Sequence, residues 1–161
     1  MSAPPDFILG EFPRTLDERH RLSIPAEFVE PLLTSGPDCI LAKERPGCLS
    51  LWNAAVWKSG LDEGVELVRN KIRAGKLEGR VAEVQRFSRL LSTRHKIVQL
   101  AGRGRLSIPD GFREFLQVET GGEVFVVGAG VCVEIWSPRP WLAYLEARMP
   151  RFRRMFDKLS S

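Results

Sequence analysis

Two pairs of arginines are the residues whose type and spacing best suit chemistry, Arg19 with Arg21 and Arg103 with Arg105. The second arginine of each pair begins the sequence Arg-Leu-Ser-Ile-Pro. A guanidinium group is permanently charged and forked, which suits phosphate oxygens and the O6/N7 edge of guanine. On a two-residue spacing, both side chains leave the same face of a strand. The pattern predicts contact with a polyanion, while for one pair alone solvation of a turn, or pairing with Asp17 or a glutamate, explains it equally well.

The sequence offers no constellation typical of an enzyme. His20 and His95 stand alone, and the glycines around Arg103 lack the spacing of a nucleotide-binding loop. The three cysteines form no C-x-x-C pair, so we interpret them as reduced packing residues and expect no metal site: Cys39, Cys48 and Cys132. We therefore predict no enzymatic activity, no cofactor and no small-molecule substrate.

Basic residues gather in one part of the chain. The net charge is +4, but residues 69–113 hold 12 basic residues against three acidic ones. Such an asymmetry is typical of a polyanion-binding surface, and equally of a solvated helix face. No apolar stretch is long enough for a membrane helix, and residues 1–6 lack the features of a signal peptide, so we expect a cytoplasmic protein without membrane contact.

The chain repeats itself at an offset of 84 residues, which aligns residues 15–57 with 99–141 without a gap. Both arginine pairs and both Arg-Leu-Ser-Ile-Pro sequences coincide at this offset. So do Cys48 with Cys132, and two tryptophan pairs, Trp52 with Trp136 and Trp57 with Trp141. Because tryptophan is rare, these coincidences indicate a duplicated module. Preservation of the arginines in both copies favours a binding role for them.

Both copies predict the same order of elements. Alternating apolar residues indicate strand on either side of tight turns at 17–20 and 101–104. Pro25 and Pro109 suit the first turn of a helix, which Pro31 should end at about Glu30 in the first copy, whereas the second runs on to Leu116. A hairpin follows in each copy, at 39–52 and 123–136. About 40 residues are too few to fold alone, so we expect the modules to close a shared barrel about a pseudo-twofold axis.

Helical periodicity marks the segments outside the two modules. Apolar stripes predict two helices between the copies, with a break near Gly75, and a further helix after Trp141 that Pro150 interrupts. These stripes favour packing at a core or an interface. The expected organisation is module 1 at 7–57, a helical connector at 58–94, module 2 at 95–141 and a helical C-terminal segment at 142–161.

The duplicated motif resembles that of the MraZ family, whose members carry two AbrB-like modules. The family signature, approximately Asp-x-Lys-Gly-Arg followed by apolar-x-Ile/Val-Pro, corresponds to residues 17–25 and 101–109. The resemblance covers nearly the whole chain and implies an α+β fold, a swapped-hairpin β-barrel with flanking helices. It also implies a ring-shaped homo-oligomer in the cytoplasm and nucleoid. This assembly would repress the division and cell-wall gene cluster by binding tandem G-rich promoter repeats.

By motif position, the resemblance places DNA binding on the two loops: Arg19, His20 and Arg21, and Arg103, Gly104 and Arg105. His20 replaces the family's glycine in copy one, Ala101 replaces its aspartate in copy two, and arginine replaces each lysine. His20 implies either a strained turn or a changed loop. The alternative function is an antitoxin-like protein-interaction module, with residues 151–158 as a partner-binding arm.

Overall fold

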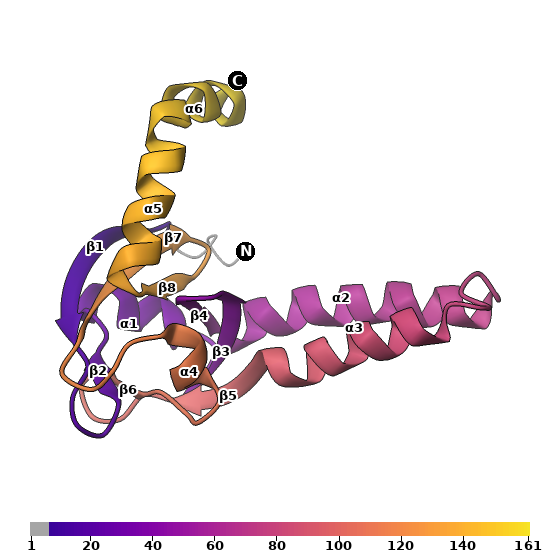
Figure 1. Cartoon of the computed structure of the whole chain (residues 1–161), viewed down its shortest axis with the longest axis horizontal. Coiled ribbons are helices and arrows are strands. Elements are labelled where there is room, and N and C mark those ends of the chain that lie inside the picture. Colours follow the sequence, from indigo (N-terminus) through magenta and orange to yellow (C-terminus); the bar gives the residue numbers. More distant parts are fainter. Residues whose placement is uncertain (1–6) are drawn as a thin grey trace.

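A computed structural model describes residues 7–161 of the chain. Residues 1–6, on which the expectation of no signal peptide rests, lie outside this range. Figure 1 shows a β-rich body from which two helical arms project in different directions. Among the helices of residues 7–161, none is long and apolar enough to cross a membrane.

The order of elements in the first half of the body recurs in the second half. The first half contains β1 (Ile8–Thr15), β2 (Arg21–Ser23), α1 (Ala26–Leu32), β3 (Asp38–Arg45) and β4 (Cys48–Asn53). The second half contains β5 (His95–Gln99), β6 (Arg105–Ser107), α4 (Phe112–Leu116), β7 (Glu123–Gly130) and β8 (Val133–Trp136). The predicted turns, hairpins and strands are confirmed at these positions.

Strands from the two halves interleave in one antiparallel sheet with the order β1-β7-β8-β4-β3-β5. The first strand of each half pairs with the hairpin of the other half, β1 with β7 and β5 with β3. The short strands β2 and β6 pair only with each other, as a separate two-stranded ribbon. Because nothing in residues 7–161 links the edge strands β1 and β5, the sheet is open and the expected closed barrel is not formed.

One hydrophobic core joins the sheet, the ribbon and the two short helices. The ribbon and its flanks contribute Leu22 and Leu106, buried to 2% and 0% exposure, together with Ile24 and Ile108. The helices contribute Phe28, Leu32, Phe112 and Leu116. Since each half supplies one strand of the ribbon and one of these helices, neither half could bury its apolar face alone.

Helix α1 runs past the point at which Pro31 was expected to end it. It continues to Leu32 because Leu32 is buried in the core and because Asn53 Nδ2 donates to the Pro31 carbonyl, 3.1 Å away. Both prolines were expected in the first turn of a helix, but Pro25 directly precedes α1 and Pro109 lies before the turn that leads into α4. Helix α4 ends at Leu116, as predicted.

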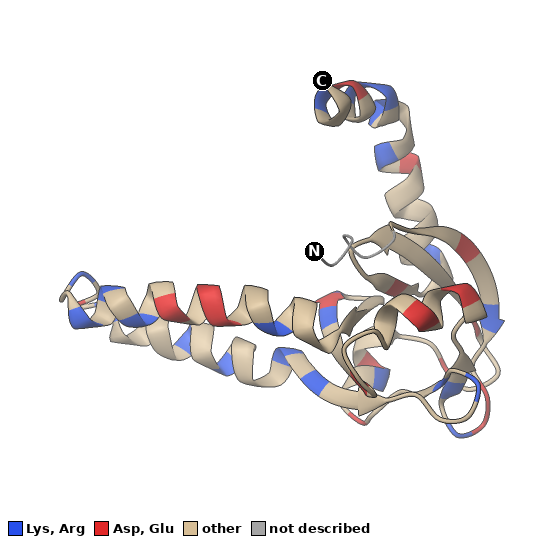
Figure 2. Cartoon of the chain, turned by 180° about the vertical axis from the view of Figure 1, so that it is seen from behind, with Lys and Arg blue, Asp and Glu red and all other residues tan. Residues whose placement is uncertain are grey.

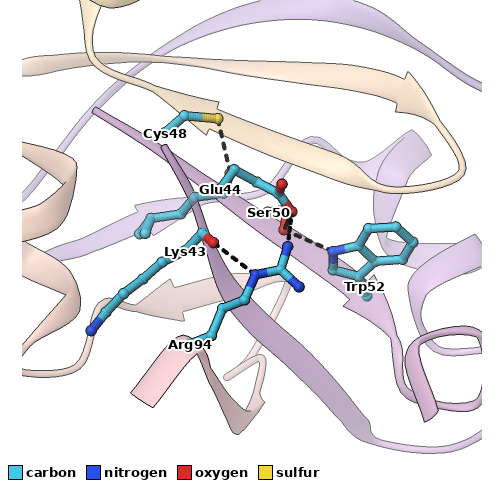
Figure 3. Close-up of polar contacts among 7 residues, drawn as sticks. Lys43, Glu44, Cys48, Ser50, Trp52 and Arg94 are labelled. Atoms are coloured by element: carbon cyan, nitrogen blue, oxygen red, sulfur yellow. Dashed lines mark hydrogen bonds and ion pairs between the residues drawn. The ribbon is translucent and has the colours of Figure 1, made fainter. Parts of the chain in front are cut away.

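The connector forms a helical hairpin of α2 (Ala54–Arg73) and α3 (Val81–Arg94), and Gly75 lies in the intervening turn with φ 71°. Asn53 caps α2, because its side-chain oxygen accepts from the backbone N–H groups of Ala55 and Val56. The base of α3 is fixed by Arg94, which donates to the Lys43 carbonyl and to Glu44 Oε1 (Figure 3). Glu44 also accepts from Ser50, which in turn accepts from the Trp52 indole.

The second arm consists of α5 (Pro138–Arg148), a 3-10 turn (Met149–Arg151) and α6 (Phe152–Ser160). The break at Pro150 is confirmed. Trp141, Tyr144 and Leu145 of α5 pack on Trp136 of β8, which attaches the arm to the sheet. All residues of α6 are exposed.

Candidate nucleic-acid interface

The β2–β6 ribbon brings the two predicted loops together at one end of the body (Figure 1). Leu22 lies opposite Leu106, Arg21 opposite Ser107, and Ser23 opposite Arg105. Because side chains alternate along a strand, the two leucines enter the core and the other four residues share the outer face. Two arginines and two serines therefore line the outside of a two-stranded ribbon.

Matching backbone hydrogen bonds close the two loops. The Asp17 N–H donates to the Arg21 carbonyl at 2.9 Å, and the Ala101 N–H donates to the Arg105 carbonyl at 2.8 Å. Each loop also bonds to the other half of the chain: Ile24 N–H donates to Gly104 O, and Ile108 N–H donates to His20 O, both at 2.8 Å. The six predicted residues thus lie in two loops that hydrogen bonds join to each other's half of the chain.

Asp17 organises the first loop. One of its carboxylate oxygens accepts from the backbone N–H groups of Arg19 and Arg21, at 2.8 and 2.9 Å, and the other lies 3.0 Å from Arg21 Nε. The Arg21 backbone hydrogen bond is the main reason that the pKa of Asp17 lies below its usual value, with added contributions from Arg19 and the Arg21 side chain, while partial desolvation opposes the shift. With Glu18 also present, the two acidic and two basic residues of this loop balance.

The second loop carries uncompensated positive charge. Ala101 stands where the first loop has Asp17, and Arg103 and Arg105 are both exposed. Within residues 7–161, no salt bridge is formed by either arginine. The loop therefore presents two free guanidinium groups, whereas the first loop presents one, on Arg19.

His20 and Gly104 adopt the left-handed backbone region, with φ 57° and φ 94°. Of the two outcomes expected for His20, the structure has the strained turn. Gly104 is required for a further reason, because a Cβ atom there would lie 2.7 Å from Val29 Cγ2. His20 lies beside α4, where it lines a shallow hollow with Asp110 and Arg113.

Sequence reasoning missed Arg14, which lies on β1 next to the ribbon. Its Nε donates to the Ser23 carbonyl at 3.2 Å, and its guanidinium lies 5.5 Å from the centre of the Phe12 ring. The residue lies outside the aligned repeat, so the offset of 84 gives no signal for it. Only its position three residues before Asp17 could have indicated it.

Most of the basic segment 69–113 does not belong to the ribbon. Its first part lies along the helical hairpin, where Figure 2 shows lysine and arginine at the far tip. Of the basic residues in this segment, only Arg103 and Arg105 lie on the ribbon or its loop. The charge excess is thus divided between two separate regions.

The cysteines show the burial expected of packing residues. Burial raises the pKa of the Cys39 thiol to about 11 and that of Cys132 to about 12, and it raises that of Cys48 as well. All three are buried and free of disulfides. In the described part of the chain, no group of three or more candidate ligands is arranged to hold a metal ion.

Comparison with known proteins finds relatives that are bacterial transcriptional regulators. A family model described as "MraZ protein, putative antitoxin-like" matches residues 94–158. The transcriptional regulator MraZ of Roseiflexus castenholzii is 31% identical over 139 residues, which cover 86% of this chain and 87% of the relative. That of Alkaliphilus metalliredigens is 30% identical (84% and 85%), and that of Syntrophomonas wolfei is 28% identical (94% and 95%). The chain belongs to the MraZ family of transcriptional regulators.

Proposed function

We propose that this protein binds double-stranded DNA through the outer face of the β2–β6 ribbon. The binding residues are Arg19, His20, Arg21, Arg103, Gly104 and Arg105, of which the arginines contact DNA and the other two shape the turns. One observation carries the proposal: two loops far apart in sequence lie on one ribbon, with Arg21 and Arg105 on its outer face. Two-stranded ribbons fit the major groove of DNA, where arginine recognises guanine.

The ribbon acts within two AbrB-like modules, residues 7–57 and 95–141, which exchange hairpins. Residues 58–94 connect them, and residues 142–161 form the C-terminal segment. The pairing of β1 with β7 and of β5 with β3 supports this division, because each half completes the sheet of the other. The module acts by binding, not by catalysis, and needs no cofactor.

In the cell, the protein is a cytoplasmic, nucleoid-associated regulator that assembles as a ring-shaped homo-oligomer. Several subunits engage tandem repeats in the promoter of the division and cell-wall gene cluster and repress it. The names of the relatives support regulation of transcription. The replacement of lysine by arginine in both loops changes the geometry of the contact, so the preferred repeat differs in sequence from that of relatives with lysine.

Fluorescence anisotropy tests DNA binding. A labelled duplex from the protein's own upstream region should bind more tightly than a random duplex of equal length. Because phosphate contacts release counterions, the affinity should fall steeply as salt is raised. Equal affinity for both duplexes, or a flat response to salt, would contradict the proposal.

The antitoxin-like description of the family supports a second candidate, a protein-interaction module. The exposed basic helix α6 favours it, because such helices bind acidic or apolar grooves. Under this function, a single partner protein would co-purify in equal amount, without nucleic acid.

A further inference from the structure

Helix α6 has an apolar face that no other part of residues 7–161 covers. Phe152, Met155, Phe156 and Leu159 follow the helical spacing of one stripe, and their exposed fractions are 58%, 46%, 55% and 79%. The Phe152 and Phe156 rings lie 6.2 Å apart and form an aromatic pair on this stripe. A stripe of this composition is typical of a helix that packs against another surface.

The base of the α2–α3 hairpin contains an open apolar cavity of about 360 Å³. Its lining includes Trp52 and Trp57, Phe87 and Leu91 of α3, and the ion pair of Glu44 and Arg94. The hydrogen bonds of Arg94, Glu44, Ser50 and Trp52 in Figure 3 fix this edge. The cavity is therefore built on a fixed framework.

The second half of the chain shows what fills the corresponding space there. At the offset of 84, Trp52 and Trp57 correspond to Trp136 and Trp141, and Gly60 corresponds to Tyr144. The Tyr144 ring stacks on Trp141 with an interplanar angle of 12° and lies 5.2 Å from Trp136. In the first half, Trp52 and Trp57 keep a ring separation of 5.5 Å, and the His95 ring lies 5.4 Å from that of Trp57, but Gly60 supplies no ring from α2. The first half thus lacks the ring that Tyr144 adds to the tryptophan pair of the second half.

No contact within residues 7–161 requires glycine at positions 60 and 64. Both lie inside α2 and line the cavity, although glycine weakens a helix interior. A Cβ atom at either position would meet nothing within 4 Å among the described residues. Their use is explained if a side chain from outside packs closely against α2.

The charges on α2 beside the cavity indicate which segment supplies that side chain. The part of α2 beside the cavity carries Asp62, Glu63 and Glu66 against Lys58, whereas α6 and the residue before it carry four basic residues against Asp157. Arg86 and Arg89 lie on α3, so a basic helix would place its charged side toward α2. Apolar and charged groups of α6 therefore both match this site.

We propose that α6 of a second copy of this chain docks on the α2–α3 hairpin and inserts Phe152 or Phe156 into the cavity over Trp52 and Trp57. The two arms of one chain project in different directions, so the contact joins separate molecules (Figure 1). Each copy then has one donor helix and one receiving cavity. Such head-to-tail contacts form a ring where the rotation between neighbouring subunits closes. The inference therefore rests on the proposed homo-oligomer but not on DNA binding.

The test removes each side of the contact separately and measures molar mass by light scattering without DNA. The wild type should be a multiple of the 18.2 kDa chain. Gly60→Tyr fills the cavity from within, as Tyr144 does in the second half, and should yield a monomer. Phe152→Ser/Phe156→Ser removes the inserted rings and should also yield a monomer. An equimolar mixture of the two variants retains one intact contact and should yield a dimer.

Two control variants should keep the molar mass of the wild-type assembly. Ser59→Tyr lies one position from Gly60 and outside the cavity lining, and Leu142→Ser changes an exposed apolar residue of α5. Circular dichroism confirms that each variant is folded. A monomeric wild type would overturn the proposed homo-oligomer and this contact with it. If the wild type is oligomeric and either cavity or helix variant keeps its mass, or if the mixture forms large oligomers, the contact is wrong while the assembly stands.

Discussion

At the scale of single residues, the two loops of the ribbon differ most in how their arginines are balanced. The Asp17 carboxylate holds Arg21 through a salt bridge to its guanidinium and a hydrogen bond from its backbone N–H, whereas Ala101 leaves Arg105 without a carboxylate. A guanidinium that must leave an ion pair contributes less to DNA binding than one that is free, because the lost pair offsets part of the new contact. The second loop should therefore carry the greater share of affinity.

Arg105→Ala should weaken binding to the upstream duplex by about 1–3 kcal/mol, and Arg21→Ala should weaken it by less. Anisotropy titrations at fixed salt measure both. Arg139→Ala, an exposed arginine on α5, is the control and should bind as the wild type does. Equal losses for Arg21→Ala and Arg105→Ala would show that the Asp17 pair does not restrain Arg21. No loss in the double variant would remove the ribbon as the DNA contact.

Asp17 also predicts a pH dependence of stability. Its pKa is lowered in the folded protein, chiefly by the Arg21 backbone hydrogen bond, so ionised Asp17 stabilises the fold above its unfolded pKa of 3.8. This stabilisation is lost as the pH falls through the lower, folded pKa. Asp17→Asn keeps an oxygen for the backbone but cannot ionise. In urea unfolding, the advantage of the wild type over Asp17→Asn should shrink as the pH falls below 3.8; a constant difference would contradict the role of the charge.

At the scale of elements, local signals in the sequence predicted most pieces of the fold. Composition and spacing marked the hairpins, and Gly75 and Pro150 marked the helix breaks that the structure confirms. The prediction that Pro31 ends α1 at about Glu30 was wrong, because burial of Leu32 outweighs the local cost of proline within the helix. The open sheet was also beyond local reasoning, since strand pairing between distant halves depends on the whole chain.

For the candidate site as well, the sequence predicted the local elements but not every contact between them. The repeat predicted which residues form the loops, because paired arginines persist at one offset. It did not predict that Arg14 lies beside the ribbon, because Arg14 lies outside the aligned repeat, or that Gly104 packs against Val29, because that contact joins segments far apart in sequence. The sequence leaves open whether Arg21 pairs with Asp17, and the structure shows the pair, with 3.0 Å between Arg21 Nε and Asp17 Oδ2.

The two left-handed turn residues should respond differently to substitution. Gly104→Ala places a Cβ against Val29 at φ 94° and should lower the free energy of unfolding by about 1–3 kcal/mol. His20→Gly relieves strain at φ 57° while it adds freedom to the unfolded chain, so the net change should stay within about 1 kcal/mol. Chemical denaturation measures both. Destabilisation by His20→Gly as large as that by Gly104→Ala would show that the His20 side chain stabilises the fold by more than its backbone strain costs.

At the scale of the whole molecule, one chain carries one β2–β6 ribbon, which is the proposed DNA contact, and two arms that leave the body away from it (Figure 1). In the proposed function, DNA contact and assembly therefore use separate parts of the chain. Subunits joined through the arms would present several ribbons together, so a second ribbon would find the next repeat at high effective concentration. Affinity for tandem repeats should then depend on the arms, although no residue of the arms needs to touch DNA.

Gly60→Tyr should separate these two contributions. On a duplex with one repeat, the variant should bind as the wild type does, because its ribbon is unchanged. On a duplex with tandem repeats, it should lose avidity, by about 10²–10⁴-fold. Arg105→Ala should instead weaken binding to both duplexes, since it removes a contact from every ribbon, and Ser59→Tyr should affect neither. Loss of single-repeat binding in Gly60→Tyr would mean that the hairpin shapes the ribbon directly, and equal tandem affinity would mean that the subunits bind independently of one another.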